Sequence, residues 1–211
     1  MSIRIELKNQ QIELLPERAV HWVDKSTLLV ADVHWGKTET FRARGIPLPD
    51  GVFSSDLLRL SAALKRSGAK RLVVLGDLVH ARDGLTEEVR ASVERWRKEH
   101  PVELVLVRGN HDTMRMPSSW EIEEVDDVLT EGPFTLSHEP VRTKGSYVWG
   151  GHIHPMVRLV GRGDSLRLAC FHIGEHVGAL PAFSEMTRGL NVRRGKGDRI
   201  FVPVEDRVIE V

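Results

Sequence analysis

Five short segments of the chain carry side chains that bind divalent metals well. They occur in the order Asp32-Val33-His34, Gly76-Asp77, Gly109-Asn110-His111-Asp112, His138 and Gly151-His152-Ile153-His154. Carboxylate, amide carbonyl and imidazole groups are hard to borderline ligands, and the segments supply enough of them for two divalent ions. Because the segments are spread over residues 32–154, they can meet only where the fold brings strand ends together. The pattern predicts a binuclear metal hydrolase.

The ligand types narrow the choice of metal. No thiolate accompanies the five segments, which argues against an iron–sulfur cluster or a structural zinc site. We expect two divalent ions, with Mn2+ as the first candidate and iron, zinc or Mg2+ as alternatives. A carboxylate shared by both ions is needed to hold them roughly 3.5–4 Å apart, and Asp77 is expected to be that bridge. Gly76 and Gly109 are expected to let the backbone turn beside the ions without a Cβ in the way.

Strand-like runs lead directly into three of these segments. Residues 28–30, 72–75 and 102–107 are short, aliphatic and β-branched, as buried strands of a parallel sheet are. In α/β sheets, ligands bind at the carboxyl ends of such strands. Asp32 and His34 are two residues apart in an extended segment, so they are expected to project to the same side and to hold one ion together.

Two helix-like runs lie between these strands. The first has leucines at helical spacing over residues 57–64 and ends at Gly68. The second begins at Thr86, a good N-cap with two glutamates in the first turn, and ends at His100-Pro101. Strands that alternate with helices indicate α/β organisation with crossover connections.

After Pro117 the sequence changes to short strands separated by turn residues. Strands are expected at residues 128–130, 134–137, 147–149, 156–160, 166–170 and 200–204. His138 and the 151–154 segment each follow one of these strands, so they are expected to arrive from a second sheet. The halves are joined without a Ser/Pro/Gly-rich linker, and the chain has no repeat of fixed period. We predict one domain over residues 1–211, with two sheets, outer helices and the metals between the sheets.

The composition limits the partners and the compartment. Of the 211 residues, 41% are hydrophobic and 28% are charged, as in a soluble globular protein. Thirty basic residues balance thirty acidic ones, so the chain has no overall field that attracts nucleic acid or an anionic membrane. Cys170 is the only cysteine, and residues 1–10 lack the apolar run of a secretory signal. We expect a cytoplasmic protein without a membrane partner.

The order of the motifs, D-x-H, G-D, G-N-H-D, H and G-H-x-H, resembles the calcineurin-like metallophosphoesterase superfamily. The resemblance implies an α/β fold, a four-layer αββα sandwich of two facing mixed sheets with flanking helices. It also implies two ligand sets, one of Asp32, His34, Asp77 and His154, and one of Asp77, Asn110, His138 and His152. Each of these positions carries a side chain that can bind a metal.

The same resemblance assigns catalytic roles to two further residues. His111 is expected to contact the substrate and to protonate the leaving oxygen, with Asp112 orienting its ring. The reaction would be an in-line displacement at phosphorus, in which a hydroxide held by the ions attacks. A diester has a poor alkoxide leaving group, so help from an acid matters more for DNA than for an aryl phosphate.

Further segments resemble the bacterial ligase-associated metallophosphoesterases. They are residues 28–37 (LLVADVHWGK), 40–47 (TFRARGIP), 75–82 (LGDLVHAR), 131–134 (EGPF), 151–155 (GHIHP), 161–163 (GRG) and 180–183 (LPAF). Members of that group are taken to be DNA-damage-response endonucleases, encoded beside a DNA ligase, a helicase-like protein and a second nuclease. The resemblance therefore implies DNA as substrate and those three proteins as functional partners. Residues 184–189 (SEMTRG) depart from the Gly-Glu-Phe-Thr-Gly-Gly-like ending expected there, which leaves substrate details open.

Basic residues near the motifs are candidate contacts for substrate phosphates. Lys37, Arg42 and Arg44 follow the first motif in an expected loop, where they could neutralise DNA phosphates that flank the cut or could be solvated. His80 could lie at the rim of the site or serve packing. Arg108 could point at the scissile phosphate or serve solubility.

Three function classes are compatible with these features. The first class, a nuclease or phosphodiesterase that acts in DNA repair, is supported by the ligase-associated resemblance. For this class single-stranded DNA is the expected substrate, because the chain lacks a broad basic face that could hold a rigid duplex. A small-molecule phosphoesterase, such as a nucleotide pyrophosphatase or a phosphomonoesterase, is favoured by the zero net charge and a pI near 7.2. A noncatalytic scaffold is disfavoured by the complete ligand set. A homodimer is compatible with the superfamily, although no stripe of residues indicates an interface.

Overall fold

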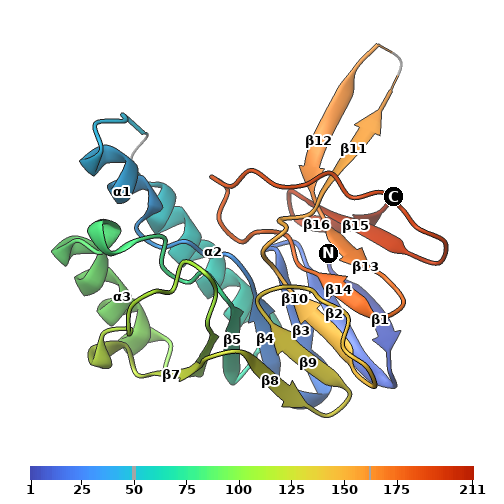
Figure 1. The fold of residues 1–211 in the computed structure, drawn as a ribbon, viewed down its shortest axis with the longest axis horizontal. Helices are drawn as coiled ribbons and strands as arrows, with labels where there is room; N and C mark the ends of the chain where they lie inside the picture. Colours follow the sequence, from blue (N-terminus) through green and yellow to red (C-terminus); the bar gives the residue numbers. More distant parts are fainter. Residues whose placement is uncertain (49–50, 162) are drawn as a thin grey trace.

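The computed structural model describes residues 1–48, 51–161 and 163–211, so Arg162 of the 161–163 motif lies outside the described residues. Two seven-stranded sheets face each other (Figure 1). The first sheet has the spatial order β1 to β7. Its strands are β1 (Ile3–Leu7), β2 (Gln10–Leu15), β3 (Ala19–Trp22), β4 (Thr27–Val30), β5 (Arg71–Leu75), β6 (Glu103–Val107) and β7 (Ile122–Val125). Strands β1 to β4 pair antiparallel and β4 to β7 pair parallel, so the sheet is mixed.

The central strands of this sheet are buried on both faces. On β4, Leu28 and Val30 pack with the helices, whereas Leu29 packs with the second sheet. On β6, Leu104 packs on the helical side and Val105 on the other. Because side chains alternate along a strand, a sheet covered on both faces needs unbroken aliphatic runs, which these strands supply.

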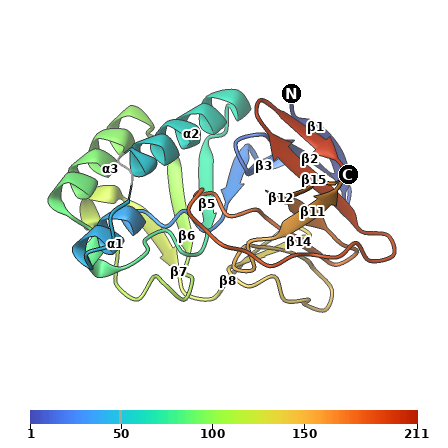
Figure 2. The ribbon, with the colours of Figure 1, turned by 90° about the horizontal axis from the view of Figure 1, so that it is seen from above.

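Three helices lie on the outer side of the first sheet (Figure 2), and the second and third of them contribute side chains to the core against it. They are α1 (Lys37–Ala43), α2 (Val52–Ser67) and α3 (Glu87–Glu99), and single 3-10 turns occur at η1 (Val23–Lys25), η2 (Arg82–Gly84) and η3 (Ser118–Trp120). Helix α2 ends at Gly68, whose φ of 64° is the left-handed C-cap conformation that glycine adopts readily. Helix α3 is capped by Thr86, whose side chain accepts a hydrogen bond from the Val89 N–H. The helix boundaries expected at Gly68 and Thr86 are confirmed.

The second sheet has the order β16-β15-β13-β14-β10-β9-β8. Its strands are β8 (Val128–Glu131), β9 (Phe134–Ser137), β10 (Tyr147–Gly150), β13 (Phe171–Ile173), β14 (Val177–Ala179), β15 (Arg199–Val204) and β16 (Arg207–Glu210). Strand β10 runs parallel to β9 and β14, and the other pairs are antiparallel. Phe134, Trp149 and Phe201 fill the space between the two sheets. Because β9 and β10 are parallel, their carboxyl ends lie at the same edge of this sheet.

The outer face of the second sheet is covered differently from that of the first. The hairpin of β11 (Met156–Val160) and β12 (Ser165–Ala169) projects from the body at this side (Figure 1). Cys170, Ile200 and Val202 form a small apolar cluster there with side chains of the hairpin. The α/β class and the two facing mixed sheets are confirmed. In the described residues, the α-helices lie on the side of the first sheet, and the base of the hairpin contacts part of the outer face of the second sheet.

No helix in the described ranges of the chain is both long enough and apolar enough to cross a membrane.

Candidate metal centre

All five metal-binding segments follow directly on strand ends at the facing edges of the two sheets. The first three follow β4, β5 and β6 of the first sheet, and the last two follow β9 and β10 of the second. Backbone hydrogen bonds tie neighbouring segments together, with His34 N–H donating to the Asp77 carbonyl (2.8 Å) and Asp32 N–H to the Gly76 carbonyl (3.1 Å). Across the sheets, His152 N–H donates to the Asp32 carboxylate (3.0 Å). The predicted convergence at strand ends is therefore confirmed.

The backbone of the centre adopts a conformation that side chains rarely favour. Among the described residues other than glycine, eleven have positive φ, and five of these carry candidate ligands. They are Asp32 (56°), His34 (52°), Asp77 (54°), His152 (59°) and His154 (45°). Left-handed backbone at such residues is unfavourable and persists where the surrounding structure imposes it, commonly at functional sites. The fold thus holds these side chains at an energetic cost.

Two glycines make room at the centre, as expected. A Cβ added to Gly76, where φ is 77°, would overlap the His138 imidazole. A Cβ added to Gly109 would overlap the Asp77 carboxylate and backbone N–H. The close approach of the β5 and β6 ends to the ligand side chains therefore depends on hydrogen at both positions.

The carboxylate of Asp77 faces both candidate ligand sets. Its Oδ2 lies 3.8 Å from His34 Nε2, and its Oδ1 lies 3.6 Å from His138 Nε2. On the His34 side, Asp32 Oδ1 lies 3.2 Å from His154 Nε2. One ligand atom from each of Asp32, His34 and His154 falls within 4.8 Å of the others, and the same holds for Asp32, Asp77 and His138. The Asp77 carboxylate thus lies between His34 and His138, while Asp32 belongs to both of these groups.

The atoms of the other ligand set also lie close together. His138 Nδ1–H donates to the Leu75 carbonyl (3.1 Å), so Nε2 is the ring nitrogen that faces the centre. That Nε2 lies 2.9 Å from Asn110 Oδ1 and 3.0 Å from His152 Nδ1. An amide oxygen and two ring nitrogens therefore converge here, as the ligand atoms of a divalent ion do. The donor set therefore fits a divalent metal, and the Leu75 carbonyl gives His138 the orienting partner that ligating histidines normally have.

Burial and charge set the protonation of the surrounding groups. Burial, aided by the charge of Lys37, holds the pKa of His34 far below its ordinary value, so the ring is in the neutral form that binds metals. For His154 burial acts in the same direction, but the hydrogen bond and charge of Asp32 outweigh it and raise the pKa. Burial also lowers the pKa of Lys37, against the attraction of Asp32 and Asp77. The ammonium group of Lys37 thus belongs to the electrostatic surroundings of the centre.

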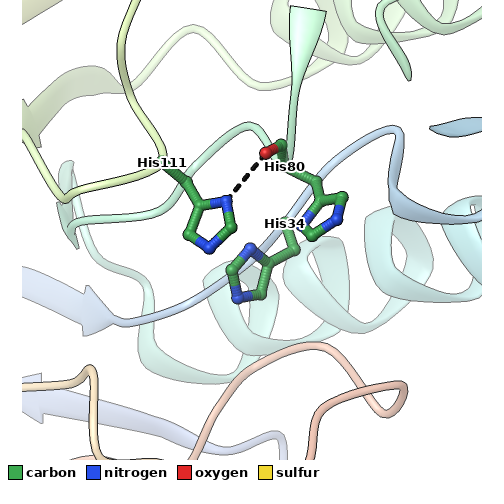
Figure 3. A group of neighbouring side chains, drawn as sticks. All are labelled: His34, His80 and His111. Carbon is green, nitrogen blue, oxygen red and sulfur yellow. Dashed lines mark hydrogen bonds between the residues drawn. The ribbon is translucent and has the colours of Figure 1, made fainter. Parts of the chain in front are cut away.

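Three histidine rings from separate segments face one another beside this cluster (Figure 3). His80 and His111 stack with ring centroids 4.9 Å apart, and His34 meets both edge to face. His111 Nδ1–H donates to the His80 carbonyl (2.9 Å), which leaves Nε2 without this bond. Burial, followed by the charge of Lys37, lowers the pKa of His80 to about 4, so its ring is neutral at pH 7. His80 therefore packs against His34 and His111 beside the candidate ligands.

The contacts of Asp112 differ from the expected one. Its Oδ2 accepts hydrogen bonds from the backbone N–H groups of Asp77 (2.8 Å) and Gly109 (2.9 Å), and its Oδ1 accepts one from Val79 (3.2 Å). The partner of the His111 ring is the His80 carbonyl, whereas the family resemblance implies Asp112 in that role. Asp112 instead fixes the backbone that carries Asp77. Burial raises the pKa of Asp112, and the Gly109 and Val79 N–H groups act against this shift.

The prediction of a loop after the first motif is wrong. Residues Lys37–Ala43 form helix α1, which begins after Gly36 in a left-handed conformation and closes its first turn by the Thr40 N–H to Gly36 carbonyl bond. Arg42 donates to the Leu48 carbonyl (3.0 and 3.2 Å) and Arg44 donates twice to Asp83 (3.2 and 3.3 Å). Both guanidinium groups therefore have partners within the chain, although the Arg44 side chain is 60% exposed.

Lys37 and Arg108 lie nearer to the metal ligands. Lys37 lines a small hollow together with His34. Arg108 lines a pocket of 360 Å³ together with Asn110 and His138, where it is ion-paired with Glu124 (2.6 Å) and donates to the Asp112 carbonyl. Of the basic candidates named from the sequence, these two line hollows that also contain candidate metal ligands.

The ring of His154 is oriented by residues 184–189, a segment that was not predicted to belong to the site. His154 Nδ1–H donates to the Arg188 carbonyl (2.7 Å), which directs Nε2 toward Asp32. Ser184 N–H donates to the Asp32 carbonyl (3.3 Å). Both bonds involve backbone groups of residues 184–189, and backbone groups leave no signature in a sequence of side chains. Within residues 184–189, Gly189 is the residue type that could have indicated this contact, because a Cβ there would overlap the His154 carbonyl.

Comparison with known families identifies the arrangement. The family model of calcineurin-like phosphoesterases matches residues 25–198. The chain belongs to this family. The metal-dependent phosphoesterase activity and the divalent metals expected from the ligand pattern are those of the family, and the described side chains supply the candidate ligand groups.

Two solved structures are similar to this phosphoesterase. The crystal structure of Pseudomonas putida nuclease MPE is 36% identical to it, with all of both chains covered and a TM-score of 0.86. This likeness agrees with the ligase-associated group. A phosphoesterase from E. coli, Yfce, is 16% identical over 88% of this chain and 97% of its own, with a TM-score of 0.46 that carries no further weight. No curated protein matches the chain significantly.

Proposed function

We propose that this phosphoesterase is a binuclear endonuclease that cleaves DNA, preferably single strands, in DNA repair. The observation that carries the proposal is the likeness over the full length of both chains to a protein described as a nuclease. We further propose that residues 1–211 act as one cytoplasmic domain, and that it works with a DNA ligase, a helicase-like protein and a second nuclease. Mn2+ is the proposed metal, since the carboxylate, amide and imidazole donors suit it.

The proposed ligand roles follow the contacts around Asp77. One ion would be held by Asp32, His34, Asp77 and His154, and the other by Asp77, Asn110, His138 and His152. When bound, such a pair of divalent ions supplies the nucleophile and stabilises charge on the phosphoryl oxygens.

The remaining roles fall to groups that are not ligands. The His80 carbonyl orients the His111 ring through Nδ1, so that a proton held on Nε2 can be given to the departing sugar oxygen. The cations of Lys37 and Arg108 lie where they can offset phosphate charge at the ligand cluster. Asp112 keeps the backbone of Asp77 and Gly109 in place.

One assay tests the proposal. The purified protein is incubated with Mn2+ and with single-stranded DNA, duplex DNA, mononucleotides and a bis-aryl phosphate, and chelation of the metal by EDTA serves as the control. We expect metal-dependent internal cleavage of the single strand, faster than cleavage of duplex. Hydrolysis of mononucleotides and bis-aryl phosphate without any cleavage of DNA would refute the nuclease assignment, and faster cutting of duplex would refute the strand preference.

A small-molecule phosphoesterase is the second candidate. The balance of 30 basic and 30 acidic residues and the pI near 7.2 favour it, because most enzymes that hold polynucleotides carry excess positive charge. Under this alternative, mononucleotides or dinucleotide pyrophosphates would be the best substrates in the same assay.

A further inference from the structure

A pocket of 660 Å³ lies on the surface away from the metal ligands and has a basic lining. We call it the basic pocket. Its lining includes Lys8, Arg142, Lys144, Tyr147 and His176, and no acidic side chain is found among the described residues that line it. The mechanism of phosphate hydrolysis has no use for this pocket, because its residues lie at the opposite end of β10 from the 151–154 segment.

The three strongest cations of the basic pocket have no acidic partner. Lys8, Arg142 and Lys144 are exposed, and none forms an ion pair in the part of the chain that the structure describes. Elsewhere on the surface, arginines such as Arg66 and Arg71 are paired with glutamates. Unpaired cations gathered around one hollow repel one another, and a bound anion removes that repulsion.

The backbone that carries these cations is well held. Lys8 and Asn9 form the two-residue turn between β1 and β2, with φ of 52° and 59°. Glycine, asparagine and aspartate are preferred at the first of these positions, so a lysine there is unfavourable for the turn and indicates another role. On the opposite wall, Ser146 Oγ–H donates to the Pro133 carbonyl (3.2 Å) and accepts from Thr135 Oγ1–H (2.8 Å).

The basic pocket is connected to the metal centre by one loop. This loop, residues 138–146, begins at the candidate ligand His138 and ends at the wall of the basic pocket. Between them lies the 360 Å³ pocket beside Asn110, and Thr143 lines both pockets. Beyond Arg108, which is itself paired with Glu124, the intermediate pocket contains the carboxylates of Asp126, Asp127 and Glu139, which repel phosphate. A strand that leaves the centre on this side therefore finds its next favourable phosphate position in the basic pocket.

The separation suits a polymer and not a mononucleotide. Tyr147 lines the basic pocket and the segment with His152 begins at the other end of β10, and the three steps of this strand span roughly 10 Å at about 3.3 Å per residue. Resting on the proposed function, we propose that the basic pocket binds backbone phosphates of a single-stranded nucleic acid whose scissile phosphate lies at the metal centre. It explains how a chain of zero net charge can hold a polyanion: the attraction is local.

The test is the binding of a fluorescently labelled 30-nucleotide DNA strand to the whole chain, measured by anisotropy in EDTA over a range of salt concentrations. The variant is K8E/R142E/K144E, and K8Q/R142Q/K144Q is made as well in case the reversed charges impair folding. The matched control is K65E/K70E/K98E, which changes the net charge equally at exposed lysines on the helical side of the molecule. Circular dichroism verifies that each variant is folded.

We expect the wild type and the control to bind alike, and the pocket variants to bind more weakly with a shallower salt dependence. Each phosphate that a protein neutralises on a single strand adds about 0.7 to the slope of log K against log salt. If the pocket neutralises two or three phosphates, the slope of the variants is smaller by about 1.4 to 2. In cleavage assays with Mn2+, the ratio of 30-mer cleavage to bis-aryl phosphate hydrolysis should fall in the pocket variants.

Two results would overturn the inference. One is pocket variants that bind the strand with the wild-type affinity and salt slope, and the other is a wild type that does not bind it. Neither depends on whether the wild type cleaves DNA, which decides the proposed function separately. Equal weakening by the control variant would also count against the pocket, since it would show an effect of net charge alone.

Discussion

The most informative single substitution is Asp112→Asn. The wild-type carboxylate accepts three backbone N–H groups, from Asp77, Val79 and Gly109. An asparagine of the same shape can keep the two bonds at one oxygen, but it presents an NH2 group where the Val79 N–H needs an acceptor. The substitution therefore removes one bond to a charged acceptor and leaves two donors facing each other.

The expected loss of stability follows from these contacts. A hydrogen bond to a charged group contributes about 1.5–3 kcal/mol, and a buried unpaired donor costs a similar amount. Burial raises the pKa of Asp112, so removing its charge offsets part of the loss. We expect the free energy of unfolding to fall by about 2 kcal/mol, which for a chain of this length lowers Tm by roughly 4–8 °C. Because Asp77 is held by the same carboxylate, metal affinity should weaken about 10- to 100-fold.

The assay combines urea unfolding in EDTA with titration of Mn2+ followed by activity. Glu6→Gln is the matched control, since the Glu6 side chain is exposed on β1, makes no hydrogen bond or ion pair in the described ranges and loses the same charge. An Asp112→Asn protein with the urea midpoint and Mn2+ affinity of the control would refute the assigned role of these three bonds.

Two further predictions concern chemistry and pH. Replacing His111 by alanine should slow DNA cleavage by about 10²–10⁴-fold, the usual contribution of a general acid. Hydrolysis of a bis-aryl phosphate should slow much less, because an aryl oxide leaves without a proton. Equal losses on the two substrates would contradict the role of His111 as general acid. Burial raises the pKa of Asp56 to about 6 from an ordinary 3.8, so the folded protein favours its protonated form. The stability due to this proton is complete below about pH 4 and is lost as pH rises through 6, a change of about 3 kcal/mol that Asp56→Asn should abolish. Urea unfolding of both proteins at pH 4 and pH 7 measures it, and parallel pH dependence would exclude it.

Much of the scaffold is predictable because the relevant signals are local. Aliphatic runs locate β4, β5 and β6 within one or two residues, and the Thr86 cap and Gly68 stop locate the ends of two helices. The alternation of Ile3, Ile5 and Leu7 with polar residues also carries the signal for β1, a strand that is missing from the sequence-based predictions.

Other elements have weak local signals. Strands β13 and β14 are three residues long and contain His172 and Gly178, which are poor indicators of strand. Helix α1 has seven residues, two of them buried threonines, and is too short for a hydrophobic period to be visible. These elements form because tertiary contacts hold them, and such contacts are not encoded by neighbouring residues.

The residues that ligate can be named from their spacing, whereas the groups that orient them cannot. His111, His138 and His154 each donate Nδ1–H to a backbone carbonyl, from His80, Leu75 and Arg188 respectively. Every residue of the chain has a backbone carbonyl, so no residue type marks the partner. Sequence patterns therefore predict which atoms can bind a metal, and the fold decides which nitrogen of each ring is left to do so.

The same reasoning explains how residues 184–189 can depart from the expected ending without disturbing the centre. Their contacts with it are made by the Ser184 N–H and the Arg188 carbonyl, groups that do not depend on the side chain. Gly189 is constrained by the absence of a side chain, because a Cβ there would overlap the His154 carbonyl. The side chains of Glu185, which pairs with Arg59 (2.6 Å), and of Met186, which lines the hollow beside His34, do not take part in the bond that directs His154 Nε2 toward Asp32. A change of residue type in this segment alters what surrounds the metal ligands and leaves the ligands where they are.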